Sequence, residues 1–278
     1  MSLSYSNLPV YVGAQNTNSI IEADAYIPST QANVSLTTAN TAKRLLGRDV
    51  TSTDQFRING PLGANISFSC FLDPVFAGGF DFMAADRDTS FFPIQIGGNL
   101  YKNCYLSDYS ISVAPYVPVT LSANFVSLTP ASGEKVGGDA NPYGGAALPF
   151  DPDDIAYGHT CTLTNMTTVV GSVQSQINYR KTFSRTPIYS LGSTLASSMI
   201  LDSVESQMSI TSTGLGNLID FNGTELSSNL TVNLLNVDGD VTIPALTMTA
   251  GAKVLTQGYN VNGGDTLSAS ATIKEINL

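Results

Sequence analysis

Apolar and polar residues alternate along most of the chain, in short runs that end at Gly, Pro, Asn or Asp. Clear examples are residues 65–71, 109–113 and 230–234. A period of two places successive side chains on opposite faces of a strand, so these runs predict half-buried β-strands. At 237–241 an Asp-Gly pair separates two strand-like runs, which is the strongest short-range signal of a β-hairpin.

Helical periodicity is scarce, with weak candidates at 80–87 and 216–222. The pattern therefore predicts an all-β protein of β-sandwich or half-barrel type, with at most one short helix in each half. Around 129–158 the composition shifts toward Gly, Pro, Ala and Asp and loses β-branched residues, as in a linker. We expect a first β-domain at 1–130, a linker at 131–156 and a second β-domain at 157–278.

Weak internal repeats support this division. Thr120-Leu121-Ser122-Ala123 recurs as Thr266-Leu267-Ser268-Ala269, an offset of 146. Three other short segments recur in the same order at similar offsets: 32–34 and 177–179, 65–69 and 207–211, and 108–111 and 258–261. One such match carries no weight in a sequence this rich in Ser and Thr. Their shared order predicts that the two domains are copies of one β-unit.

The surface is expected to be polar but weakly charged. Hydrophobic residues make up 42% of the chain and charged residues 12%, about half the usual share for a soluble domain. The 22 acids and 12 bases give a net charge of -10, without a basic cluster. This balance argues against tight nucleic-acid binding, which depends on Lys and Arg, and suits a wall that nucleic acid must pass without sticking.

No residue pattern predicts catalysis, a cofactor or a metal. The single histidine, His159, has no Ser, Cys or Asp partner at a known spacing. Cys70, Cys104 and Cys161 show no CxxC spacing, so we expect buried free thiols. The acidic run 150–154 lacks the spacing of a calcium loop and is interpreted as solvated linker. The N-terminus resembles no signal peptide, and no apolar run is long enough to span a membrane.

The order of elements in the first half resembles the tail tube proteins of long-tailed bacteriophages. A Pro-containing strand at 8–12 precedes a basic hairpin at 31–48, which resembles the family's long hairpin reaching onto neighbouring subunits. A Gly-Pro turn at 60–63 leads into an alternating strand at 66–68, and the strand at 106–113 resembles the one that closes the tube domain. In the second half the Gly-Pro turn is missing.

The resemblance implies a non-enzymatic virion protein of the tail, made in the host cytoplasm. Its subunits would assemble with themselves into stacked rings around a channel through which DNA passes. A duplicated chain would close a ring as a trimer with pseudo-sixfold symmetry, and a single-unit chain as a hexamer. Sheath, baseplate and tape-measure proteins are the further partners that the resemblance implies.

The basic residues of the two halves are the candidate subunit contacts: Lys43, Arg44, Arg48 and Arg57, then Arg180, Lys181 and Arg185. They either decorate solvated hairpins or clamp acidic groups of a neighbouring subunit. Two other functions stay open, a baseplate, hub or neck component with the same fold, and an exported β-sandwich adhesin. A glycan hydrolase is disfavoured because Trp, a common sugar platform, is absent.

Overall fold

The computed structural model describes fourteen stretches of the chain, and the fold is described for these alone. They are residues 10–20, 25–27, 29–44, 55–73, 90–96, 99–127, 138–139, 152–164, 173–193, 195–213, 225–226, 228–239, 242–262 and 266–277. Both short helix candidates, at 80–87 and 216–222, lie outside them.

Within these stretches the chain is all-β, with one 3-10 turn. The first half contributes β1 (Val10–Val12), β2 (Ala25–Ile27), β3 (Ser29–Arg44), β4 (Gln55–Phe71), β5 (Phe92–Ile96), β6 (Asn99–Val113), β7 (Thr120–Ser127) and β8 (Gly138–Asp139). The second contributes η1 (Pro152–Asp154), β9 (Thr162–Thr164), β10 (Val173–Tyr189), β11 (Ala196–Thr213), β12 (Leu230–Leu235), β13 (Thr242–Met248), β14 (Lys253–Asn262) and β15 (Thr266–Asn277). The all-β fold class is confirmed.

The predicted alternation appears directly as burial. Along β7 every second side chain is buried. In the first half of the core, Phe68 of β4 stacks on Phe125 of β7 with ring centroids 5.7 Å apart. The predicted hairpin also forms, because Asp238 and Gly239 lie in the turn between β12 and β13. Gly239 has a φ of 76°, which glycine adopts without a steric penalty. Local sequence therefore accounts for the strands and this turn.

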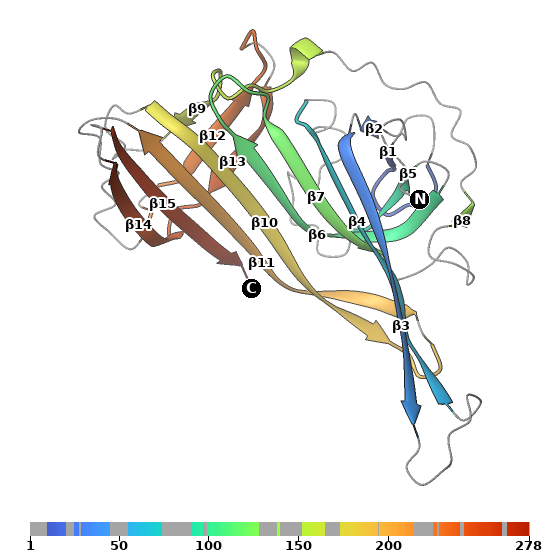
Figure 1. Ribbon diagram of the computed structural model, residues 1–278. Helices are drawn as coiled ribbons and strands as arrows, with labels where there is room; N and C mark the ends of the chain where they lie inside the picture. The colour runs from blue at the N-terminus through green and yellow to red at the C-terminus, as the bar shows by residue number, and fades with distance from the viewer. Residues whose placement is uncertain are drawn as a thin grey trace.

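Twelve of the described strands form one large antiparallel sheet (Figure 1). Its main path runs β3-β4-β7-β6 through the first half and β10-β11-β15-β14 through the second. The two sets join where β6 pairs with β10, so the sheet continues without interruption from one half into the other. We call this junction the internal seam.

Two groups of strands cover one face of this eight-strand path, one from the same twelve-stranded sheet and one from a separate sheet. In the first half β5, β1 and β2 continue from β6 and supply buried residues such as Val10 and Ile94. In the second half β13, β12 and β9 form a separate sheet, whose Val232 and Met248 are fully buried. All these residues belong to one hydrophobic core that extends through both halves. The described strands therefore form two layers and leave one polar face of the large sheet uncovered.

The two four-stranded sets agree in order and largely in register. Val34 of β3 faces Ile66 of β4, and Tyr179 of β10 faces Met208 of β11. Tyr179 lies 145 residues after Val34, and Met208 lies 142 residues after Ile66. Likewise, Tyr109 of β6 faces Ala123 of β7, and Tyr259 of β14 faces Ala269 of β15. The offsets are 150 residues for the two tyrosines and 146 for the two alanines. The repeat offsets found in the sequence thus connect strands at the same place in each set. The pairing of β11 with β15 differs by two residues from that of β4 with β7, which keeps the same side chains on the same face.

Two hairpins extend beyond the large sheet (Figure 1). The β3–β4 hairpin leaves it because β4 pairs with β7 only from Ala64 onward. The β10–β11 hairpin leaves it after Thr182, the last residue of β10 that pairs with β6. Both hairpins point toward the same end of the molecule.

The predicted domain boundaries remain a prediction, because the described residues show one continuous sheet and one core. Ile155 and Ala156, at the end of the expected linker, are buried, and the Ala156 backbone donates a hydrogen bond to Leu72 and accepts one from Val119 of the first half. No helix in the described part of the chain is long and apolar enough to cross a membrane.

Candidate assembly interface

Among the described strands, the internal seam is where the two sets meet edge to edge. β6 and β10 run antiparallel, with Tyr109 facing Lys181, Ile111 facing Tyr179 and Val113 facing Ile177. On the covered face, the rings of Tyr109 and Tyr179 lie 6.1 Å apart, and both side chains are buried. Backbone pairing and buried aromatic packing therefore hold the seam together.

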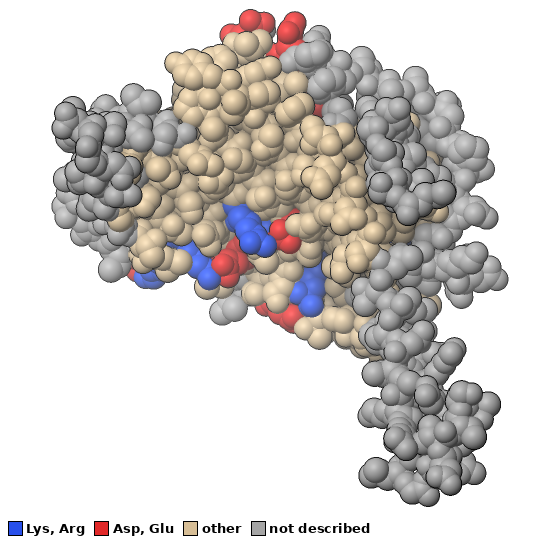
Figure 2. Space-filling model, in the orientation of Figure 1, with Lys and Arg blue, Asp and Glu red and all other residues tan. Residues whose placement is uncertain are grey.

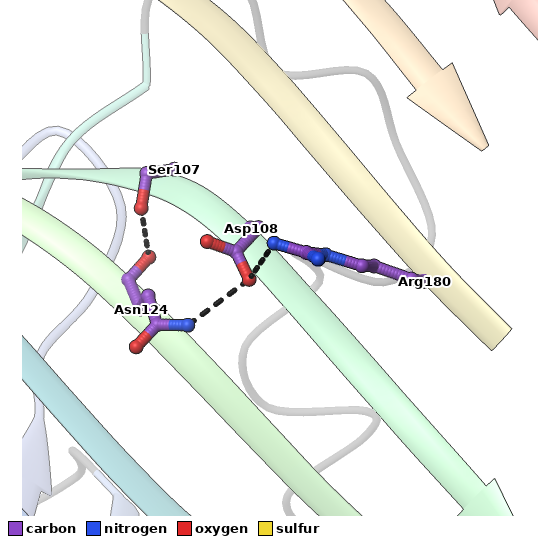
Figure 3. A network of polar contacts seen from close by, with 4 residues as sticks. All are labelled: Ser107, Asp108, Asn124 and Arg180. Atoms are coloured by element: carbon purple, nitrogen blue, oxygen red, sulfur yellow. Dashed lines mark hydrogen bonds and ion pairs between the residues drawn. The ribbon is translucent and has the colours of Figure 1, made fainter. Parts of the chain in front are cut away.

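A polar network crosses the seam on the uncovered face (Figure 3). Arg180 Nη2 lies 3.3 Å from Asp108 Oδ1, which also accepts a hydrogen bond of 3.0 Å from the Asn124 amide. The Ser107 hydroxyl donates to the Asn124 carbonyl oxygen at 3.0 Å. The network lies at a bulge of β6, where the register with β7 shifts between Leu106 and Asp108. Since the Arg180 side chain is 60% exposed, water screens this ion pair and it stabilises the seam weakly.

The other two basic candidates of the second half also lie along the seam. Arg185 donates from Nε to the Leu106 carbonyl at 3.2 Å, and its guanidinium lies 5.6 Å from the centre of the Tyr105 ring. The Lys181 ammonium lies 5.6 Å from the centre of the Phe183 ring. Arg180, Lys181 and Arg185 thus make contacts within their own chain.

The first-half candidates lie elsewhere. Lys43 and Arg44 belong to the end of β3, where they face Phe56 and Gln55, and Arg57 lies on β4 opposite Ala42. Arg48 lies outside the described residues. The structure therefore separates the seven cations into a seam group and a hairpin group, rather than gathering them at one site.

The two ends of the eight-strand path are open edges. Among the described residues β3 pairs with β4 alone, and β14 pairs with β15 alone apart from a bridge between Glu225 and Lys253. From Ser29 to Ala42 and from Val254 to Asn262 these strands contain neither a charged residue nor a proline. Monomeric proteins usually protect an edge with such residues. Long unprotected edges are therefore the strongest association sites that the fold offers.

A groove of about 420 Å³ lies beside the β14 edge. Its lining includes the exposed side chains of Leu255 on β14 and Ile276 on β15, together with Ala250 and Ala252. The groove thus lies at the start of β14 and the end of β15, and Leu255 is its lining residue from the open edge.

The remaining candidates do not converge on a reactive site. His159 is exposed and stacks on Tyr116, with ring centroids 5.9 Å apart. Cys70 and Cys104 are buried free thiols, as expected, and Cys161 is a partly buried one. Across the residues with described positions, no three His, Cys, Asp or Glu side chains lie close enough to hold a metal ion.

The chain matches no protein-family model, and a search of curated proteins finds no match. The resemblance to tail tube proteins therefore depends on the order and pattern of elements given above.

Three seam residues, Arg180, Lys181 and Arg185, were sequence-based candidates, whereas the buried Tyr109–Tyr179 pair, Asp108 and the two open edges were not. The repeat offsets did contain the necessary signal, because they relate β3 to β10 and β6 to β14. What they lacked was the information that β6 and β10 pair with each other.

Proposed function

We propose that the chain is a structural tube subunit, of the kind that forms the tails of long-tailed bacteriophages, and that three copies close into a ring. The observation that supports this is the internal seam. It joins the fourth strand of one set, β6, to the first strand of the next, β10. The two open edges are the same kind of strand, the fourth strand β14 and the first strand β3. The open edges of one chain are therefore the same two kinds of strand that pair at the internal seam, so β14 of one copy can pair with β3 of the next.

The register of this joint follows from the internal one. Adding 150 to the β6 positions and subtracting 145 from the β10 positions converts the pair Ser110–Arg180 into Asn260–Ser35. We expect β14 of one copy to pair antiparallel with β3 of the next, with Asn260 facing Ser35. Val34, which takes the place of the buried Tyr179, is partly buried against the core at an edge where the neighbour would complete its burial.

Simple geometry supports a closed ring. Each chain supplies eight consecutive strands to the path from β3 to β14. Three chains supply 24 strands; with a spacing of about 4.8 Å and a tilt of about 40°, they close a barrel about 48 Å across between backbones. Barrels of about 16 to 18 strands already leave a water-filled channel. Closure also removes both open edges, which otherwise expose unpaired backbone groups.

The uncovered face suits the wall of such a channel. The covering layers lie about one sheet spacing, roughly 10 Å, from the large sheet, so placing them inside the barrel would fill much of its width. With those layers outside, the lumen is lined by residues such as Ser110, Ser112 and Asn178, which alternate with the core residues of β6 and β10. On the face drawn in Figure 2, acidic groups stand at the upper rim, the area below them is almost uncharged, and basic and acidic groups lie side by side in a lower band. Among the described residues of this face, the cations lie beside acidic groups and form no separate basic patch that would hold DNA phosphates.

Cysteine cross-linking tests the joint. In a Cys161→Ser background, the pair Ser35→Cys and Asn260→Cys should form intermolecular disulfides on mild oxidation, with covalent dimers and trimers on a denaturing gel. Negative-stain microscopy should show rings about 80 Å wide, which is the barrel, a covering layer roughly 10 Å beyond it on each side, and the outward side chains of that layer.

The matched control pairs Ser35→Cys with Val261→Cys, one residue further along β14. A shift of one residue turns the side chain to the opposite face, so this pair should cross-link poorly. Equal cross-linking of both pairs, or a monomer without cross-links at high concentration, would contradict the proposal.

A further inference from the structure

The exposed large hydrophobic side chains of the described residues fall in three places. Leu255 and Ile276 line the groove at the β14 edge. The other seven lie at the two ends of the seam strands: Tyr116, Val117 and Val237 at one end, and Ile188, Tyr189, Leu191 and Ile200 at the other. Scattered single exposures need no explanation, but clusters near opposite ends of the long strand β10 indicate contact surfaces.

The first cluster, which we call the turn patch, is built by three segments. Residues 114–119 connect β6 to β7, residues 156–160 lie against them, and Val237 follows the end of β12. Pro118 bridges to Tyr157, Gly158 N donates to the Val117 carbonyl at 3.1 Å, and Tyr157 N donates to the Leu235 carbonyl at 3.2 Å. The patch is thus a defined surface, held by backbone hydrogen bonds.

Gly158 lets its own segment lie directly against the backbone of Ala114. A Cβ atom at this position would lie 1.8 Å from the Ala114 carbonyl oxygen, so any other residue would push the segment away. This contact brings His159 onto Tyr116. The backbone is therefore arranged to present two stacked rings.

Tyr116 itself adopts a φ of 60° and is 85% exposed. Asn or Gly occupies this left-handed region with less strain, whereas a bulky aromatic residue there is an outlier. Strained residues of this kind cluster where they serve a contact or a switch. The exposed ring at Tyr116 is consistent with a partner that covers it.

The second cluster, which we call the hairpin tip, lies at the far end of β10. Leu191, at the turn, is fully exposed at 106% of its reference area. Ile200 lies beside Thr186 on the neighbouring strand, and Ile188 is two residues further along the same face. From Ile177, beside the turn patch, β10 continues twelve residues to Tyr189, which is about 40 Å of extended strand. The tip and the turn patch therefore lie at opposite ends of one strand.

The two projecting hairpins differ at their ends. Lys43 and Arg44 of β3 take the places that Ile188 and Tyr189 have on β10, at the offset of 145. A ring of three chains would present three apolar tips alternating with three basic hairpins. Copies stacked on it could then meet it in three rotational positions rather than six.

We propose that the hairpin tip of one copy docks on the turn patch of a second copy in the adjacent ring, and that this contact stacks the rings. A contact between different surfaces at opposite ends of a molecule does not close on itself and repeats along an axis. A second copy is the occupant because the same chain carries both apolar surfaces, facing opposite ways along the seam strands. This inference rests on the ring proposed above.

A charge exchange tests the contact. Leu191→Lys should leave rings intact and raise the critical concentration for tube formation about tenfold or more, because it removes a buried leucine from each contact. Tyr116→Asp should do the same, and Asp tolerates the left-handed backbone at this turn. Combining both variants in one chain should restore tubes at low salt, because each new lysine would then face a new aspartate.

The control is Leu191→Met, which keeps an apolar tip and should form tubes as the unaltered chain does. The readouts are sedimentation velocity and negative-stain microscopy, which separate single rings from tubes. Tubes that form equally well with Leu191→Lys, or a double variant that remains as single rings, would overturn the stacking contact while leaving the ring intact. Loss of the rings themselves in the cross-linking experiment would instead reject the proposed function.

Discussion

At the scale of single residues, the buried thiols have the most distinctive chemistry. Burial raises the pKa of the Cys70 thiol far above its ordinary value, and the negative charge of Asp73 adds to the effect. Burial also raises the pKa of the Cys104 thiol and outweighs the hydrogen bonds that favour its thiolate. Both thiols therefore stay protonated in the folded chain and react slowly with alkylating reagents.

This protonation predicts a loss of stability in alkaline solution. In the unfolded chain these thiols ionise with a pKa near 9.0, whereas in the folded chain they remain neutral above that pH. The unfolded state therefore releases protons first, and the free energy of unfolding falls as the pH rises above 9.0, by up to about 1.4 kcal/mol per pH unit for each thiol.

Urea unfolding between about pH 8 and pH 11, followed by circular dichroism, measures this slope. The double variant Cys70→Ala and Cys104→Ala should be less stable at neutral pH because of the cavities it creates, yet lose less stability per pH unit. An identical alkaline slope for both proteins would show that other groups cause the loss.

At the scale of elements, the two faces of the internal seam contribute unequally. Tyr179 is buried against Tyr109, and its hydroxyl lies 3.4 Å from the Ser206 hydroxyl in the core. Its neighbour Arg180 points to the uncovered face, where water reaches most of its side chain. Tyr179 and Arg180 are adjacent on one strand, so one contributes buried packing to the seam and the other contributes an exposed ion pair.

We expect Tyr179→Ala to lower the free energy of unfolding by about 3 to 5 kcal/mol, because it leaves a cavity in the seam. Arg180→Ala should cost less than about 1 kcal/mol, because an exposed ion pair contributes little. Urea unfolding measures both, with exposed Asn178→Ala as the control on the same strand. A loss from Arg180→Ala as large as that from Tyr179→Ala would mean that the polar network, rather than packing, joins the two sets of strands.

At the scale of the whole molecule, one sheet and one core connect both halves of the chain. Met208 of β11 and Ile66 of β4 belong to the same cluster of buried residues, although they come from different repeats. Removing either half would expose the buried side of the seam to water. The two halves thus share an order of strands, but their buried side chains pack into one common core.

The chain should therefore unfold in a single cooperative transition. Native-state hydrogen exchange measures this residue by residue: backbone amides of β4 and β7 should open with the same maximal free energy as those of β11 and β15. Urea unfolding followed by circular dichroism and by thiol labelling of Cys70 should give coincident midpoints. Two separate free energies, one for each half, would instead support two independently stable domains.

The sequence alone was sufficient to predict the strands and the Asp238–Gly239 hairpin, and its repeat offsets match the order of strands in the two four-stranded sets. These features depend on local patterns, because alternation determines which side chains face the core and Asp-Gly favours a tight turn. The offsets from 32–34 to 177–179 and from 108–111 to 258–261 agree with the observed strand registers because each repeat preserves its own local pairing.

The tertiary structure decided which strands pair across the halves and which remain open. Every strand carries the same backbone donors and acceptors, so the sequence of β6 does not specify whether β10 or another strand completes it. That choice depends on contacts between residues far apart in the chain, such as Tyr109 with Tyr179, and on the layers that cover one face. For the same reason the structure was needed to show that Arg180 faces Asp108 within its own chain, and that β3 and β14 lie at the two ends of the path.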